Sequence, residues 1–223
     1  MSLNYSAISE ETLDSVLETN TRSGEWIYAQ PRHVPSIADC TFYHTMNLPG
    51  HGTVEGHWDL RDGIDNYLGH ANFAGKRVLD VGTASGHLCF EMEKRGAEVV
   101  AFDLAEDELW DFVPFIHQNA EETRAKVKPW LRKLHNGFWL AHAAMGSKAK
   151  VCHARVYEPP AKLGKFDTAL LGSILLHLRD PMLALERIAD LVTDTIIVTD
   201  MTPALYFPQT HFGDFRNPQM TPK

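Results

Sequence analysis

The chain has 223 residues, of which 44% are hydrophobic and 22% charged, and its formal net charge is −8 at pH 7. These values are typical of a soluble globular domain that can bury its own core. The sequence contains no run of 18 apolar residues, so it predicts no membrane-spanning helix. The acidic balance argues against a nucleic-acid partner, because binding to phosphates needs many lysines and arginines on one surface.

Three cysteines, Cys40, Cys89 and Cys152, lie far apart and show neither metal-binding nor redox spacing. They indicate reduced thiols in a cytosolic protein. The first residues, Met1–Tyr5, lack the basic start and the apolar stretch of a signal peptide, so we expect a cytoplasmic location. No pattern in the sequence indicates an oligomeric state.

The first 70 residues predict an extension that packs on a core formed by residues 71–223. Within it, Ser9–Asn20 has the cap and the apolar spacing of a short helix. Residues Arg22–Gly63 are rich in Gly, Pro, His and aromatic side chains without a sustained period, which predicts irregular structure. A second short helix is expected within Asp59–Leu68, leading into the first strand of the core.

The core has an α/β pattern in which buried strands alternate with amphipathic helices. The expected strands are Arg77–Val81, Glu98–Phe102, Val151–Ala154, Phe166–Leu171 and Thr195–Thr199. The expected helices are Gly86–Arg95, two segments over Asn119–Asn136 and Gly137–Met145, and one that opens at Asp180–Pro181. This order predicts a doubly wound, mostly parallel sheet of Rossmann-like type, with ligands at the carboxyl ends of its strands.

Two features of this α/β pattern are unusual. Residues 105–147 are far longer than an ordinary crossover, so we interpret them as a helical insertion after the second strand. Residues 201–223 have no alternating strand pattern, so we expect the last strands of such a fold to be missing from this chain. The last helix is expected to bury Met182, Leu185, Ala189 and Val192.

A glycine turn follows the first strand of the core, over Asp80–Gly86. Gly82 and Gly86 remove side chains where a ligand must approach the backbone, and the free amides of the helix start favour a carboxylate. Asp103, about 20 residues further on, ends the second strand and can accept both hydroxyls of a ribose. The predicted cofactor contacts here are Asp80, Gly82, Thr83, Ala84, Ser85, Gly86, Asp103 and Leu104.

The turn does not match the dinucleotide fingerprint, which needs glycines at positions 82, 84 and 87. Ala84 and the bulky His87 occupy two of these positions, so an NAD-dependent oxidoreductase is a distant alternative. The spacing instead resembles the D/E-x-G-x-G-x-G motif of S-adenosylmethionine (SAM)-dependent methyltransferases, with Ala84 in place of the middle glycine.

A second signature extends this resemblance. The chain is similar to class I methyltransferases of the wobble-uridine tRNA-modifying group, which transfers a carboxymethyl group from carboxy-SAM. The stretches that match are Leu79–Gly82, Arg95–Val100, Phe166–Asp167 and Leu176–Pro181. The resemblance implies a methyltransferase fold with SAM as its cofactor, whereas the substrate has to be argued from the site itself.

Further cofactor contacts are expected at the ends of the third and fourth strands. Arg155 stands where the resemblance implies an acidic residue for the adenine amino group, so we expect the adenine to rest on the backbone of Val156. Gly172 and Ser173, at the end of the fourth strand, complete the predicted set.

Methyl transfer needs alignment of donor and acceptor, and a base only where the acceptor must lose a proton. His177 follows the fourth strand and His44 lies in the extension, so both are candidate catalytic residues, with ordinary structural roles as the alternative. Phe138, Trp139 and His142 are expected in the core. His51, Glu55, His57 and Asp59 show no recognised ligand spacing, and no metal site is predicted.

The sequence therefore predicts a SAM-dependent methyltransferase acting on a small or medium organic acceptor, with the inserted helices forming a wall for that acceptor. One alternative is a tRNA wobble-uridine modifier, favoured by the resemblance and by Arg124, Lys128 and Arg132, which repeat every fourth residue along one helical face. Another alternative is a non-catalytic SAM-binding partner subunit that retains the fold without an acceptor site.

Overall fold

The computed structural model describes residues 27–108, 111 and 119–200. The helices and strands are β1 Met46–Leu48, β2 Gly52–Val54, α2 Ile64–Tyr67, β3 Arg77–Val81, α3 His87–Lys94, β4 Glu98–Asp103, α4 Ala120–Met145, β5 Lys150–His153, β6 Phe166–Gly172, α5 Pro181–Ala189 and β7 Val192–Thr199. Short 3₁₀ helices cover Ile37–Asp39, Ala161–Leu163 and Leu175–His177. Within the described ranges, no helix is both long and apolar enough to cross a membrane.

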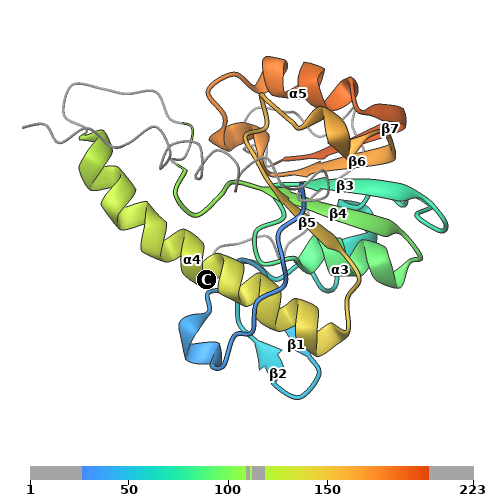
Figure 1. Ribbon diagram of the computed structural model, residues 1–223. Helices are drawn as coiled ribbons and strands as arrows, with labels where there is room; N and C mark the ends of the chain where they lie inside the picture. The colour runs from blue at the N-terminus through green and yellow to red at the C-terminus, as the bar shows by residue number, and fades with distance from the viewer. Residues whose placement is uncertain (1–26, 109–110, 112–118, 201–223) are drawn as a thin grey trace, which may run out of the picture.

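Five strands form one parallel sheet in the order β5-β4-β3-β6-β7 (Figure 1). Of the five strands of this sheet, β3 comes first in the sequence, and it lies in the middle, between β4 and β6. This arrangement confirms the predicted doubly wound parallel sheet. It also creates a switch point beside β3, where ligands of such sheets bind.

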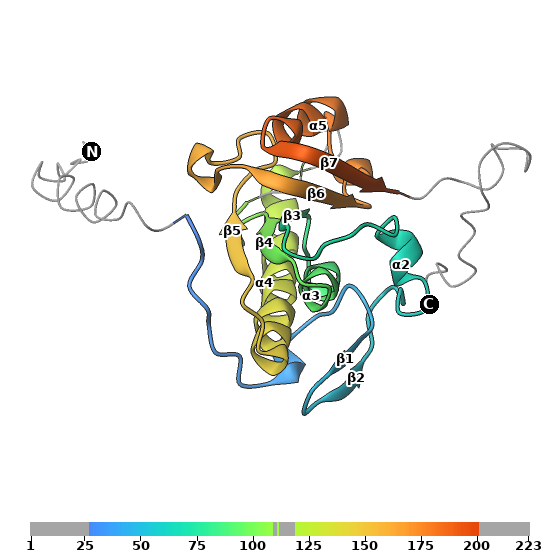
Figure 2. The ribbon, with the colours of Figure 1, turned by 90° about the vertical axis from the view of Figure 1, so that its right-hand side faces the viewer.

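The two faces of the sheet are buried by different elements (Figures 1 and 2). Val78 belongs to a hydrophobic cluster with residues of α3 and α4, whereas its neighbour Leu79 belongs to a cluster with residues of α5. The alternation follows from the strand geometry, which points successive side chains to opposite faces. Both residues are fully buried, so β3 is buried on both faces, as the sequence predicted.

The last helix fully buries other residues than those expected. Ala184 and Ile188 of α5 are fully buried, whereas Met182 is 71% exposed, Ala189 is exposed and Leu185 is intermediate. The Asp180 side chain caps the helix by accepting from the backbone N–H of Leu183 at 2.9 Å. Val192 is not part of the helix, because β7 already begins there. Leu185 and Val192 do pack against the core cluster, so the predicted buried face was right for these two residues and wrong for Met182 and Ala189.

The inserted segment also differs from its prediction. One continuous helix, α4, covers both expected helical segments, while residues 104–108 are not helical. Gly137 lies inside this helix. A glycine is needed at this position because the chain of the extension crosses the helix there. A Cβ atom on Gly137 would lie 2.4 Å from the carbonyl oxygen of Thr41. The Thr41 N–H also donates to the carbonyl of Lys133 at 2.9 Å.

The described part of the extension runs from residue 27 to α2. Its hairpin of β1 and β2 is antiparallel, and Met46, Leu48 and Val54 from it are buried in the cluster that contains α3 and α4. Within Asp59–Leu68 only the four residues of α2 are helical. The helix expected over Ser9–Asn20 and the segment 201–223 lie outside the described residues.

The crossing of Thr41 over α4 makes a prediction about stability. Gly to Ala inside a helix ordinarily stabilises it by about 1 kcal/mol. At Gly137 the added methyl group meets a backbone oxygen, so Gly137→Ala should instead lower the free energy of unfolding measured by urea denaturation.

Gly146→Ala is a matched control at the end of the same helix, where nothing lies within 4 Å of the added Cβ atom and φ is +63°. It should cost about 1–2 kcal/mol through its backbone conformation alone. A Gly137→Ala protein more stable than the unmodified chain would contradict the crossing.

Candidate active site

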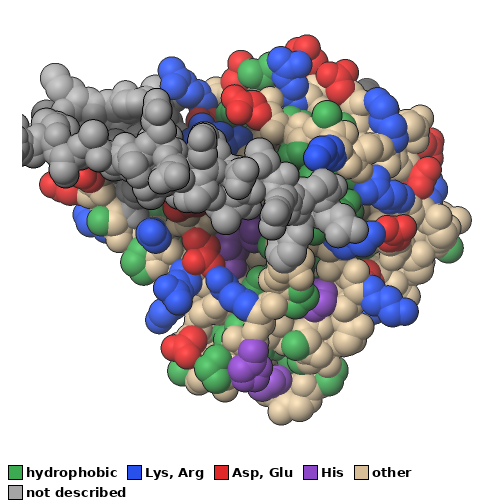
Figure 3. All heavy atoms as spheres, viewed as in Figure 1, with side chains coloured by type: hydrophobic (Ala, Val, Ile, Leu, Met, Phe, Trp, Pro, Cys, Tyr) green, Lys and Arg blue, Asp and Glu red, His purple; other side chains and the backbone are tan. Residues whose placement is uncertain are grey.

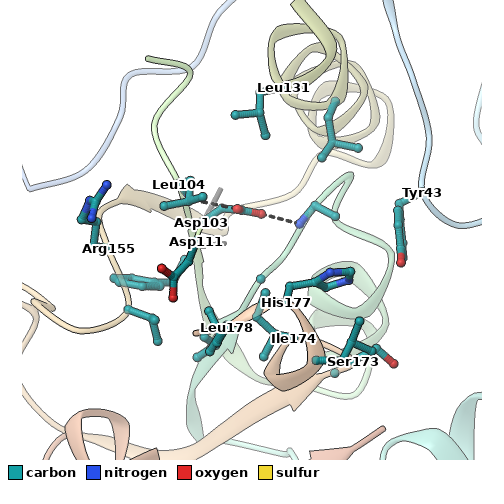
Figure 4. A pocket seen from close by; sticks show the side chains of 18 of the residues that line it. Tyr43, Asp103, Leu104, Asp111, Leu131, Arg155, Ser173, Ile174, His177 and Leu178 are labelled. Carbon is teal, nitrogen blue, oxygen red and sulfur yellow. Dashed lines mark hydrogen bonds between the residues drawn. The ribbon is translucent and has the colours of Figure 1, made fainter. Parts of the chain in front are cut away.

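A cavity of about 580 Å³ lies at the carboxyl ends of the parallel strands (Figure 4). Most of the residues predicted to contact a ligand line it: Gly82, Ala84, Asp103, Leu104, Arg155, Val156, Gly172, Ser173, His177 and His44. These residues come from the ends of β3, β4, β5 and β6, and from the extension. The volume is typical of a small-molecule site.

Asp103 joins the glycine turn to the end of β4. One carboxylate oxygen accepts from the backbone N–H of Ala84 at 2.7 Å, and the other accepts from that of Leu104 at 2.8 Å (Figure 4). A carboxylate oxygen has more than one acceptor position, so both oxygens can still accept from a ligand hydroxyl. The predicted ribose residue therefore has a fixed orientation at the wall of the cavity.

Two residues of the cavity have backbone conformations that are uncommon for side chains other than glycine. Ala84 has φ +51° and Ser173 has φ +53°. Such residues cost about 1–3 kcal/mol and persist where surrounding contacts enforce them. For Ala84 that contact is the bond to Asp103. For Ser173 it includes a side-chain hydrogen bond with the Tyr67 hydroxyl at 3.1 Å and a bond from its N–H to the Thr199 carbonyl at 2.6 Å.

Four predicted contacts are not among the residues that line the cavity: Asp80, Thr83, Ser85 and Gly86. The Thr83 hydroxyl donates to Asp80 at 2.7 Å, and both side chains are buried. Burial raises the pKa of Asp80 to about 7, and Asp103 adds to this effect, while the Thr83 bond opposes it. Asp80 is therefore a structural carboxyl group of the turn.

Ser85 and Gly86 connect the turn to other parts of the chain. The Ser85 hydroxyl accepts from the backbone N–H of Tyr43 at 2.9 Å, so the extension is held against the turn. Gly86 has φ +89°, and a Cβ atom there would lie 2.6 Å from Phe90 and 2.8 Å from Phe138. Glycine at this position lets α3 and α4 pack closely.

Charged side chains gather at the end of the cavity near β5. The Arg155 guanidinium forms an ion pair with Glu108 at 2.9 Å. Asp111 accepts from the Tyr157 hydroxyl and, at 2.7 Å, from the backbone N–H of Arg179. Arg155 is thus placed at the cavity as predicted, and its charge is balanced by an acidic neighbour.

The candidate catalytic residue His177 lies at the other end, with Tyr43 and Ser173 (Figure 4). The second candidate, His44, also lines the cavity, and its ring contacts that of Tyr43. His44 is 7% exposed, and burial lowers its pKa to about 3, with His87 and His57 adding to the effect. His177 lies in an exposed 3₁₀ turn, and burial lowers its pKa, while Asp200 opposes the shift. The low pKa makes His44 a neutral ring that is a poor base, whereas His177 lies in the exposed turn and is the better placed of the two to accept a proton.

Sequence reasoning missed several residues of the cavity wall. They are Tyr43, Asp111, Trp130, Leu131, Leu134 and Ile174. The aromatic stretch Phe42-Tyr43-His44 was the only signal for Tyr43. The α4 residues recur at helical spacing, which indicates a buried face without showing what that face covers.

Two other histidines near Asp103 were also not predicted. His153 pairs with Asp103 in the sheet register, and its ring stacks on that of His135 with centroids 4.6 Å apart. Burial lowers the pKa of both rings, and the Asp103 carboxylate opposes the shift.

The predicted core role of Phe138 and Trp139 is confirmed, because they are 2% and 4% exposed. In the described part of the chain, no group of three or more His, Cys, Asp or Glu side chains is placed to hold a metal ion.

A family model described as a methyltransferase domain matches residues 57–216. The chain belongs to the methyltransferase-domain family. The match covers the cavity walls formed by β3, β4, β5 and β6. It confirms the predicted SAM-dependent methyltransferase class, with SAM as cofactor.

Two curated relatives are tRNA U34 carboxymethyltransferases. The protein of Stutzerimonas stutzeri is 27% identical over 155 residues, which is 66% of this chain and 41% of the relative. The protein of Marinobacter nauticus is 25% identical over 155 residues, 66% of this chain and 39% of the relative. The chain therefore spans about two fifths of the length of these relatives.

A solved structure of magnesium protoporphyrin IX methyltransferase from Synechocystis, with bound SAH, has a TM-score of 0.42 and 15% identity. The likeness covers 62% of this chain and 52% of the other. A TM-score at this level adds nothing to the family assignment.

The raised pKa of Asp80 predicts how the stability of this methyltransferase depends on pH. The folded carboxyl group keeps its proton up to about pH 7, whereas the unfolded one loses it near its usual 3.8. The free energy of unfolding should therefore fall as pH rises between these values. Asp80→Asn removes this penalty, so it should raise the Tm by several degrees at about pH 8 and by less at about pH 5.

Asp194→Asn is the control, because Asp194 is an exposed carboxylate paired with Lys76 at 2.8 Å and its pKa is lowered. It should give no gain in Tm at either pH. An equal gain for Asp80→Asn at both pH values would mean that the buried carboxyl group titrates normally.

Proposed function

We propose that this chain transfers the methyl group of SAM to a small or medium organic acceptor bound in the cavity. The observation that carries the proposal is the convergence of Asp103, the Gly82–Ala84 turn and Gly172–Ser173 at one cavity. These elements end three adjacent strands of a sheet in a chain of the methyltransferase family.

The contacts suit the parts of SAM in a definite order. Asp103 accepts from the ribose hydroxyls, because each of its oxygens keeps an acceptor position. The Gly82–Ala84 turn, part of which lines the cavity just before α3, takes the amino-acid part through close approach of its backbone. The N–H groups of this turn already donate to the Phe102 carbonyl and to Asp103. Leu104 and Val156 hold the adenine between apolar groups and backbone. The sulfonium group then lies toward Tyr43 and His177.

In methyl transfer the side chains mainly align the methyl group of SAM with the acceptor atom. A lone pair of the acceptor attacks the methyl carbon in line with the bond to sulfur. That bond breaks, and its electrons stay on sulfur as the acceptor is methylated. Where the acceptor is an O–H or N–H group, its proton passes to the neutral imidazole of His177. His44, the second histidine predicted from the sequence, has a pKa lowered to about 3 by burial, so it is a weak base and His177 is the better candidate for this proton.

The ribose contact can be tested by calorimetry. Asp103→Ala should weaken SAM binding by about 1–3 kcal/mol, because it removes hydrogen bonds to a charged acceptor. Asp194→Ala, remote from the cavity, should bind SAM like the unmodified chain. Unchanged affinity in Asp103→Ala, with the fold intact by circular dichroism, would remove Asp103 from the cofactor site.

A second candidate function is tRNA wobble-uridine modification, which the names of the two curated relatives favour. On α4, Lys126, Lys128, Arg132 and Lys133 are exposed and suit phosphate contacts. The side chain of Arg124, the first residue of the predicted basic stripe, lies outside the described residues. The net charge of −8 opposes this candidate.

Salt dependence and donor choice separate the two candidates. Binding to a mixed tRNA pool should be absent, and plain SAM should bind more tightly than carboxy-SAM, whose added carboxylate needs a cation that the sulfonium end does not offer. Tight tRNA binding with a log–log salt slope of about −0.7 to −0.9 per contact, abolished by Lys128→Glu with Arg132→Glu, would establish the tRNA candidate. A preference for carboxy-SAM would point the same way.

A further inference from the structure

The cavity has two chemically different ends (Figure 4). Arg155 and Asp111 lie at one end. There Arg155 is paired with Glu108, and Asp111 accepts from the Tyr157 hydroxyl. Tyr43, His177 and Ser173 lie at the other end. The charge of the site is therefore concentrated where the adenosine part of SAM is proposed to bind.

Charged side chains are few among the described residues that line the cavity, and Asp200, which acts on His177, is not one of the lining residues. Among the described residues that line the cavity there is no lysine, and the arginines are Arg155 and Arg179. The backbone N–H of Arg179 donates to Asp111 at 2.7 Å, so the backbone of this residue lies beside Asp111. The lining carboxylates are Asp103, which is assigned to the ribose, and Asp111. A buried charge without a partner is costly, so a phosphate, a carboxylate or an ammonium group is poorly matched here.

The imidazoles at this end do not supply a positive charge. Burial lowers the pKa of His44 to about 3 and also lowers that of His177. The Nδ1 atom of His44 is buried without a hydrogen-bond partner in the described structure. An imidazolium would place a second N–H donor on a ring that already has a buried, unpartnered nitrogen, so the neutral ring is the form that fits.

The aromatic wall is fixed by close backbone packing. A Cβ atom on Gly56 would lie 2.2 Å from the carbonyl carbon of His44, so the strap of residues 41–44 fits tightly against this glycine. The Tyr43 ring meets the His44 ring edge-on, with centroids 5.0 Å apart and planes at 80°. Trp130 of α4 is a further aromatic residue of the wall. Fixed flat rings favour a flat ligand, which can stack or meet them edge-on.

We propose that the acceptor is a neutral, planar arene or N-heteroarene with an O–H or ring N–H group, bound between Tyr43, Trp130 and His177. This inference rests on the proposed methyl transfer and narrows its substrate class. The acceptor loses its proton to a histidine, so it is neutral on entry and becomes nucleophilic only beside the sulfonium group.

Three probes with one ring system test the charge preference: naphthol, naphthoate and naphthylmethylammonium. Each is titrated calorimetrically into the full chain saturated with SAH, after SAM binding has been measured on the same protein. Naphthol should bind at least about tenfold more tightly than either charged analogue, a difference of about 1.4 kcal/mol. Trp130→Ala should remove most of this binding, Trp130→Phe should restore it, and neither should change SAM affinity.

Leu176→Lys is a second variant, and it should leave the core packing and the fold intact because Leu176 is 53% exposed. Leu176 lines the cavity next to His177. The added cation should raise naphthoate affinity and lower that of naphthylmethylammonium.

The outcomes are distinct. Absence of SAM binding would refute the proposed function itself. SAM binding together with equal or tighter binding of a charged probe, or with no probe binding at all, would refute the acceptor class alone.

Discussion

The site depends on the position of β3 between β4 and β6. Val81 is level with Phe102 on one side and with Leu171 on the other. The residues that follow, Gly82 and Asp103 among them, therefore leave the sheet at the same height and can meet. A register slip of one residue would turn every side chain of a strand to the opposite face. The parallel pairing thus fixes both the core and the place of the carboxylate.

A second constraint is the close approach of the extension. Gly56 and Gly137 come from a loop and a helix far apart in sequence, yet both have backbone of the segment 41–44 where a Cβ atom would be. The N–H of Tyr43 then reaches the Ser85 hydroxyl of the turn. Because of these contacts, the cavity is shared between the extension and the sheet, and the aromatic wall cannot shift independently of the turn.

The sequence could predict features that depend on local patterns, but not those that depend on contacts between distant segments. The strands, the glycine turn and Asp103 follow from local patterns: buried runs, glycines at fixed spacing and a strand-ending carboxylate. Gly137 was misread as a helix boundary, because the reason for the glycine is the carbonyl of Thr41, almost a hundred positions away. Trp130 was missed for the same kind of reason. The inserted helix was expected to form a wall of the acceptor site, and α4 does line the cavity, but the periodicity of the helix does not show which of its residues border that cavity.

The bond between Asp103 and Ala84 links the two halves of the cofactor site. Ala84 has φ +51°, a conformation that an alanine adopts only when its surroundings hold it there. The carboxylate that is proposed to take the ribose also accepts the N–H of this residue. The turn proposed for the amino-acid part and the carboxylate proposed for the ribose are therefore joined by a hydrogen bond within the protein itself. A site ordered in this way loses less conformational entropy on binding, so its hydrogen bonds contribute more of their free energy to affinity.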